Sequence, residues 1–85
     1  MNQELIYDIL EYIGKQKCHG KSLGVYIRNN YKGKILLEIR AEDGFNDYYT
    51  FYYEDFKHLN TIREKVDSTL NDFRDRYEKM VLKKN

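Results

Sequence analysis

Three segments of the chain alternate in polarity, and in all three the more apolar side carries the odd-numbered residues. The alternation covers residues 23–28, 34–41 and 48–54. A period of two places successive side chains on opposite faces of a strand, and one apolar side is typical of a half-buried antiparallel sheet. Because the three segments agree on the apolar side, the pattern predicts three strands that share one inner face.

The connections between the predicted strands are short enough for a meander. Residues 29–33 combine two asparagines with a glycine, which is typical of a turn-rich tip. Residues 42–44 predict a three-residue loop with Gly44 in the left-handed conformation, because a two-residue turn would direct the apolar side of one strand outward. Residues 18–22 are predicted to form a loop before the first strand.

Two amphipathic segments flank the strands. Apolar residues recur at intervals of three and four over residues 3–13, and again in a longer C-terminal stripe that ends at Leu82. Asp55 or Thr61 can cap the start of this second helix, which would extend beyond the strands that it covers. The predicted fold is a two-layer α+β domain, αβββα, spanning residues 1–85. It has a three-stranded antiparallel meander sheet, with the N-terminal helix and the long C-terminal helix on one face.

Composition excludes several classes of function. A chain of 85 residues buries a thin core and leaves little room for a deep enzyme pocket. No apolar run exceeds three residues, so no membrane span is predicted. The single cysteine rules out an internal disulfide and fits the reducing cytoplasm. A net charge of +1 is unlike that of a dedicated polyanion binder.

Residues with catalytic or metal-binding chemistry are few. Cys18 and His19 are the only neighbouring thiol and imidazole, and nothing marks the third group that would orient such a pair. One cysteine and two histidines lack the paired spacing of structural zinc sites. Glycine-rich phosphate loops are also missing. We therefore expect a protein without catalytic activity, metal or cofactor.

Charge is unevenly distributed along the chain. Residues 21–41 hold five basic residues against one acid, Glu38, whereas residues 42–55 hold five acids and no base. Either these charges pair across the strands or they form an electrostatic docking surface. The outer sheet face would also carry tyrosine and arginine, which are enriched at binding hot spots. The alternative for the tyrosines is their ordinary preference for exposed strands.

The leading hypothesis is a small cytoplasmic protein-binding module that docks this tyrosine-rich, charge-segregated face on a partner. Small size and an abundance of residues with AT-rich codons favour a phage or mobile-element inhibitor of a host enzyme that handles nucleic acid. In that version Asp47, Glu54 and Asp55 imitate phosphates. The predicted partner-binding residues are Tyr26, Arg28, Arg40, Asp47, Tyr48, Tyr52, Glu54 and Asp55.

Two alternatives stay open. The chain could bind nucleic acid, with Tyr26 as a stacking platform beside a basic first hairpin. It could instead be a structural dimerisation subunit that pairs through the overhanging helix. The sequence does not name the partner, separate an inhibitor from an adaptor, or assign a role to Cys18 and His19. The cations of the first alternative are Arg28, Lys32, Lys34 and Arg40, and the dimer residues of the second are Phe73, Tyr77 and Met80.

Overall fold

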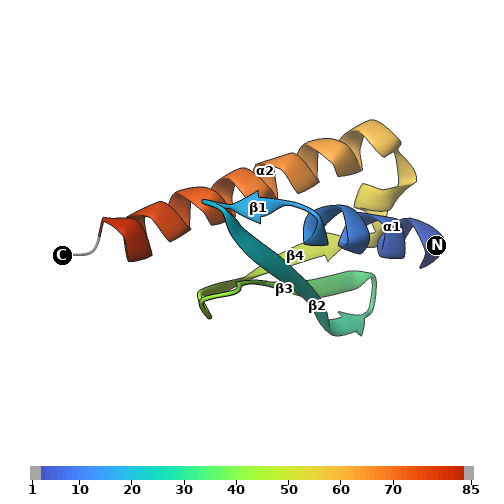
Figure 1. Cartoon of the computed structure of the whole chain (residues 1–85). Coiled ribbons are helices and arrows are strands. Elements are labelled where there is room, and N and C mark those ends of the chain that lie inside the picture. The colour runs from blue at the N-terminus through green and yellow to red at the C-terminus, as the bar shows by residue number, and fades with distance from the viewer. Residues whose placement is uncertain (1–2, 84–85) are drawn as a thin grey trace.

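A computed structural model describes residues 3–83 as an α+β fold with a helical layer on an antiparallel sheet (Figure 1). The predicted fold class is confirmed, with four strands in place of three. None of the helices in this part of the chain is long and apolar enough to cross a membrane. The elements are α1 (Gln3–Gly14), β1 (Lys17–Cys18), β2 (Lys21–Tyr31), β3 (Lys34–Ala41), β4 (Asn46–Tyr52), the 3₁₀ helix η1 (Tyr53–Lys57), α2 (Leu59–Tyr77) and the π-helical turn η2 (Glu78–Leu82).

The additional strand, β1, lies where the sequence predicted a loop. Its two residues pair with the first two residues of β2 through a tight hairpin. The turn residues His19 and Gly20 both have positive φ, 50° and 79°, which suits the type I′ turn of a two-residue hairpin. A strand of two residues shows no alternation, and the sequence pattern therefore could not reveal it.

The hairpin of β2 and β3 is longer than predicted. β2 continues to Tyr31, which pairs with Lys34, so most of the predicted tip is strand. The turn itself is Lys32 and Gly33, at φ 51° and 78°. A bulge after Ile27 interrupts the register of β2. Ile27 pairs with Leu37 of the inner face, as predicted, but beside this bulge its side chain is 37% exposed.

The loop between β3 and β4 has the predicted length. The backbone N–H of Ala41 donates to the carbonyl of Phe45 at 2.8 Å, which encloses a three-residue loop. Gly44 has a φ of 101°, the left-handed region that favours glycine. This loop keeps odd-numbered residues of β4 opposite odd-numbered residues of β3, and the predicted register of these two strands is therefore confirmed.

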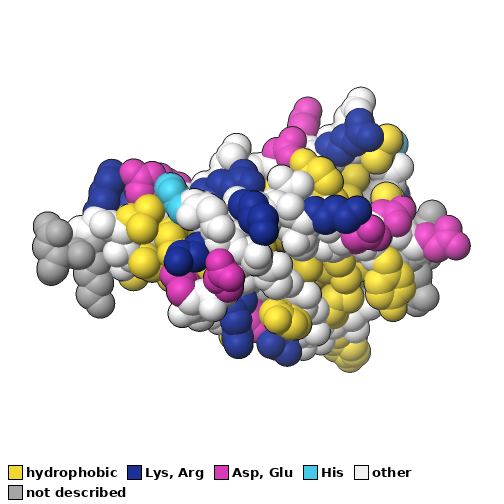
Figure 2. Space-filling model, viewed as in Figure 1, with side chains coloured by type: hydrophobic (Ala, Val, Ile, Leu, Met, Phe, Trp, Pro, Cys, Tyr) yellow, Lys and Arg dark blue, Asp and Glu magenta, His cyan; other side chains and the backbone are white. Residues whose placement is uncertain are grey.

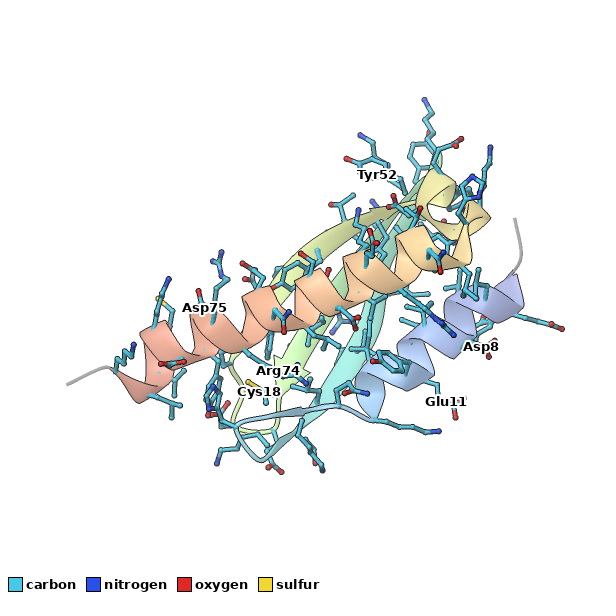
Figure 3. The ribbon with its side chains drawn as sticks, turned by 90° about the horizontal axis from the view of Figure 1, so that it is seen from above. Asp8, Glu11, Cys18, Tyr52, Arg74 and Asp75 are labelled. Carbon is cyan, nitrogen blue, oxygen red and sulfur yellow. The ribbon has the colours of Figure 1, made fainter. Side chains whose placement is uncertain are left out.

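One core lies between the inner sheet face and the two helices. Seen from above, α2 crosses the sheet diagonally, α1 lies beside it, and the C-terminal end of α2 extends past the strands (Figure 3). The opposite face, formed by the even-numbered residues of β3 and β4 and their neighbours on β2, carries no described helix and is called the open sheet face below. The core residues from the strands include Leu23, Ile35, Leu37, Ile39 and Phe51, and those from the helices include Ile6, Ile9, Ile13, Ile62, Val66, Leu70 and Phe73.

The second helix begins at Leu59, between the two predicted starts. The preceding η1 buries Phe56, whose ring lies 6.2 Å from that of Phe51. His58, in an extended conformation, separates η1 from α2. The buried aromatic therefore holds the chain in a short 3₁₀ turn before the α-helix can begin.

Two of the predicted dimer residues belong to the core instead. Phe73 and Tyr77 are 0% and 1% exposed, so neither side chain has surface to offer a second copy. Phe45, next to the β3–β4 loop, covers both rings at centroid distances of 5.3 and 5.4 Å. The hydroxyl of Tyr77 donates to Asp43 Oδ2 at 2.5 Å, and this bond together with burial raises the pKa of Tyr77 to about 12. Of the three residues only Met80 stays on the surface.

Candidate interaction site on the open sheet face

A buried glutamate occupies the middle of the open sheet face. Glu38 is 1% exposed although none of the described helices covers this side of the sheet. Its cross-strand neighbours are Tyr26 on β2 and Tyr48 on β4. A carboxylate removed from water costs free energy unless it is paired and hydrogen-bonded, so its surroundings must supply donors.

Three side chains supply the donors to Glu38. Arg28 Nε donates to Oε1 at 2.6 Å, while Arg40 donates to Oε2 from Nε at 3.1 Å and from Nη2 at 2.7 Å. Asn46 Nδ2 donates to the same Oε2 at 2.7 Å. The hydrogen bonds from Arg40, and then those from Arg28 and Asn46, lower the pKa of Glu38 to about 2. The carboxylate is therefore ionised at neutral pH and held in one orientation.

The two arginines are held in place but remain accessible. Their side chains are 45% and 47% exposed. Arg28 Cζ lies 4.9 Å from the centroid of the Tyr26 ring, and Arg40 Cζ lies 6.0 Å from it. Figure 2 shows basic and hydrophobic side chains next to one another along the lower edge of the molecule, where the sheet turns away from the helices. The residues that these hydrogen bonds and cross-strand pairs connect are called the open-face cluster below: Tyr26, Arg28, Glu38, Arg40, Asn46 and Tyr48.

Gly24 makes room for the position of Tyr26. A Cβ atom at Gly24 would lie 2.7 Å from the Tyr26 hydroxyl oxygen and 3.1 Å from two ring carbons. The tyrosine therefore leans back along β2 over the glycine, in space that any other residue would fill. The missing side chain at Gly24 thus lets the ring lie beside both arginines.

We expect Gly24→Ala to displace the Tyr26 ring while the protein stays folded. The close atoms belong to the far end of a side chain that can rotate, and alanine in a strand restricts the unfolded chain more than glycine does. The free energy of unfolding should change by less than about 1 kcal/mol. NMR chemical shifts of the Tyr26 ring should move. Gly14→Ala is the matched control, because nothing lies near its Cβ position; unchanged Tyr26 shifts in Gly24→Ala would contradict the described packing.

The structure brings together four of the eight predicted partner-binding residues, namely Tyr26, Arg28, Arg40 and Tyr48. Tyr52 lies at the end of β4, where Lys65 Nζ of α2 is 5.0 Å from its ring centroid. Sequence reasoning placed Glu38 on this face but gave it no part in the site. The signal was a lone acid with arginine two residues later on the same strand face and another on the neighbouring strand.

Asp47 and Asp55, two of the three predicted phosphate-imitating residues, pair with the second helix. Asp47 Oδ2 lies 2.6 Å from Arg76 Nε, and Asp55 Oδ2 lies 2.9 Å from Lys65 Nζ. Burial alone would raise the pKa of Asp55, but the bonds from Lys65 and a backbone amide outweigh it and the pKa is lowered. Glu54 lies in η1 and pairs with a neighbouring lysine. The three acids therefore do not join the open-face cluster.

The same two aspartates also protect the edge of the sheet. β4 is an edge strand, and the backbone N–H groups of edge strands are open to pairing with other chains. Asp47 Oδ1 accepts the N–H of Tyr48 at 2.8 Å, and Asp55 Oδ2 accepts that of Tyr52 at 2.8 Å. Each aspartate thus covers an amide of β4 and anchors α2.

Cys18 and His19, the neighbouring thiol and imidazole to which the sequence assigned no role, lie apart from the open-face cluster. Cys18 is buried, and burial raises the pKa of its thiol although the nearby Arg74 works against the shift. A protonated thiol is a poor nucleophile. The His19 ring stacks on Tyr77 at a centroid distance of 5.6 Å. Within residues 3–83 no group of three or more His, Cys, Asp or Glu side chains could hold a metal ion.

Comparisons of the chain with protein-family models, with curated proteins and with solved structures find no match. No relative therefore suggests a substrate or partner. Proposals on function rest on the charge and geometry of the open-face cluster.

Proposed function

We propose that the protein is a non-catalytic binding module that docks its open sheet face on an acidic surface of a partner protein. The observation that carries this proposal is the pair Arg28 and Arg40, which are both accessible and held by the buried Glu38. Association normally costs free energy because long side chains lose rotamer freedom. Here Glu38 already restricts both arginines in the free protein, and they suit a carboxylate-bearing surface.

The charge of the face supports an acidic partner. Arg28, Lys34 and Arg40 lie on the open sheet face, and the carboxylate of Glu38 is buried beneath the arginines. A positive patch attracts a negative partner and orients its approach. The hypothesis that Asp47 and Asp55 imitate phosphates is less well supported, because Lys65 and Arg76 of α2 neutralise the charges of these two aspartates.

Nucleic acid is the second candidate, favoured by the same positive charge and by the exposed Tyr48 ring. Single-stranded nucleic acids bind by stacking bases on aromatic rings beside cations. The predicted platform, Tyr26, is less suited to stacking than the sequence indicated. Its ring lies over Gly24 and beside the guanidinium groups of Arg28 and Arg40. A stacking base would have to displace these guanidinium groups.

Affinity capture with matched variants tests the first proposal. Tyr48→Ser removes an exposed ring from the open-face cluster, and Tyr7→Ser removes an exposed ring from α1 as its control. A partner should be captured by the wild type and by Tyr7→Ser, and its affinity for Tyr48→Ser should fall about tenfold or more. The proposal fails if every captured protein binds the two variants equally.

A fluorescence anisotropy titration tests the second candidate. Labelled single- and double-stranded DNA and RNA are titrated with the protein at low and at physiological salt. We expect no micromolar complex at either salt concentration. Binding that weakens steeply with salt and is reduced by Arg28→Ala would replace the protein partner with nucleic acid, because such dependence reports phosphate contacts.

A further inference from the structure

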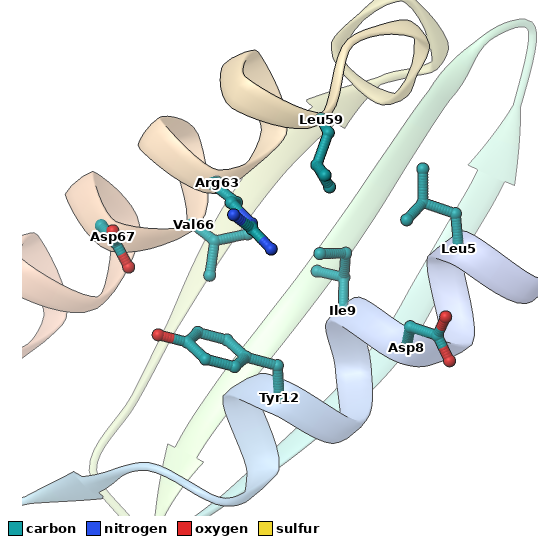
Figure 4. Close-up of a pocket in the computed structure, with 8 residues that line it drawn as sticks. All are labelled: Leu5, Asp8, Ile9, Tyr12, Leu59, Arg63, Val66 and Asp67. Atoms are coloured by element: carbon teal, nitrogen blue, oxygen red, sulfur yellow. The ribbon is translucent and has the colours of Figure 1, made fainter.

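A second candidate surface lies in the helical layer, away from the open sheet face. A groove with a cavity volume of about 450 Å³ separates α1 from α2. In Figure 4, Leu5 and Ile9 of α1 point toward Leu59 and Val66 of α2, and the Tyr12 ring reaches across toward α2. The groove thus has an apolar floor, and charged side chains stand along it: Asp8, Arg63 and Asp67.

The charges on the α2 side of this groove have no ion-pair partner among residues 3–83. Arg63 and Asp67 are one helical turn apart, a spacing at which ion pairs commonly form. Neither makes an ion pair or hydrogen bond with any residue in the described part of the chain. The neighbouring Leu59 is 52% exposed. This end of the helix therefore offers apolar surface with unpaired charge of both signs.

The opposite end of the same helix also exposes apolar side chains. Met80 and Leu82 in η2 are 62% and 51% exposed, beyond the part of the helix that the β3–β4 loop covers. Glu78 precedes them and makes an exposed ion pair with Lys83 at 3.1 Å. Arg74 lies one turn earlier with its Nε bonded to the carbonyl of Lys17. In chain order this end presents Arg74, Glu78 and Leu82. The N-terminal end begins with its leucine, Leu59, and its two charges follow.

We propose that the occupant of the groove is the C-terminal end of a second copy of this chain, with the two α2 helices antiparallel. Intervals of four, seven and four residues place Arg63, Asp67, Arg74 and Glu78 near one side of the helix. In an antiparallel pair of α2 helices, each of these charges lies opposite a residue of opposite charge. In a parallel pair, each would lie opposite the same residue of the second copy and be repelled. The resulting contacts with the second copy are Leu59 to Leu82, Arg63 to Glu78 and Asp67 to Arg74.

A two-fold axis would form every one of these contacts twice. Such an interface is isologous and closes as a dimer, so it does not propagate into a fibre. The open sheet faces lie on the side away from the helical layer and would stay free in both copies. The dimer would then present two docking faces, which increases avidity for a partner with repeated sites. The dimer itself does not depend on the function proposed for those faces.

Charge reversal provides the test. Arg63→Glu alone and Glu78→Arg alone each place like charges together twice in the dimer. The double variant, and an equimolar mixture of the two single variants, restores an attractive pair at both places. By sedimentation velocity over a range of concentrations, we expect the wild type to approach the mass of two chains. The dissociation constant of the dimer should rise about tenfold or more in each single variant. It should return toward the wild-type value in the double variant and in the mixture.

Two controls separate the interface from folding. Lys32→Glu reverses an exposed charge in the β2–β3 turn, outside the contact, and should dimerise as the wild type does. Circular dichroism should show the same helix content in all variants. The proposal is overturned if the wild type keeps the mass of one chain at every concentration. It is also overturned if the single variants dimerise as well as the wild type, or if the mixture shows no recovery.

Discussion

Replacing Phe73 with alanine is expected to lower the free energy of unfolding by about 3–5 kcal/mol. The ring is fully buried and packs against Phe45 at a centroid distance of 5.3 Å, so its removal exposes a cavity between α2 and the β3–β4 loop. A domain of this size has about 4–13 kcal/mol of stability in total. The variant should therefore unfold at a much lower urea concentration than the wild type.

The matched control for Phe73→Ala is Met80→Ala. Met80 follows on the same helix but is exposed, and its truncation should change the free energy of unfolding by less than about 0.5 kcal/mol. Both variants are measured at protein concentrations low enough to exclude association. If Phe73→Ala lost stability only at high protein concentration, the ring would belong to a contact between chains, as its position in the helical stripe first suggested.

This difference between Phe73 and Met80 shows what the sequence pattern could predict. Intervals of three and four residues identify one side of a helix but do not indicate how far other elements cover it. The apolar stripe therefore predicted the helix correctly. It did not predict that Phe45, 28 residues earlier in the chain, would cover Phe73. Coverage of a helix end depends on tertiary packing, and local periodicity carries no information on it.

The sheet shows the same division between local and non-local information. Alternation predicted β3 and β4 and their register, because a one-residue slip would expose the whole apolar side. It failed where the chain departs from alternation, at the two residues of β1 and at the bulge after Ile27. Neither feature has a pattern long enough to be recognised.

Alternation also placed Tyr26, Arg40 and Tyr48 on one sheet face, where the structure has them. It could not predict that Asp47 and Asp55 would form ion pairs with the second helix. Asp47 meets Arg76, 29 residues later, through the diagonal crossing of α2 over the sheet. The apparent charge segregation along the sequence is thus largely cancelled in space, which changes the expected partner from basic to acidic.

Replacing Glu38 with glutamine is expected to destabilise the protein at neutral pH and to flatten its acid dependence. Oε2 accepts three hydrogen bonds, from Arg40 twice and from Asn46. If the amide nitrogen of glutamine took the place of Oε2, it could not accept these hydrogen bonds. The two arginines would also lose the negative charge that holds them. Leaving buried donors without acceptors is the costly result of such a change. The variant should therefore unfold at lower urea concentration than either Arg28→Gln or Asn46→Ala.

The pH dependence follows from the lowered pKa of Glu38. The arginines hold this pKa at about 2 in the folded chain, whereas the ordinary value is 4.5. The ionised carboxylate consequently stabilises the fold fully above about pH 5, and this contribution is lost as the pH falls toward 2. Urea unfolding at pH 7, 5 and 3 should show a steep loss for the wild type and a shallower one for Glu38→Gln. Some slope should remain, because the pKa values of Asp43 and Asp55 are also lowered.

Glu54→Gln is the control for this experiment, because Glu54 makes an exposed ion pair with Lys57. Exposed pairs contribute little to stability, so its acid dependence should match that of the wild type. Equal flattening in both variants would show that Glu38 has no special part in the acid response. Glu38→Gln should also weaken capture of the partner at pH 7, since Arg28 and Arg40 would no longer be restrained on the open sheet face. Undiminished capture would mean that the partner does not need the arginines in the orientation that Glu38 imposes.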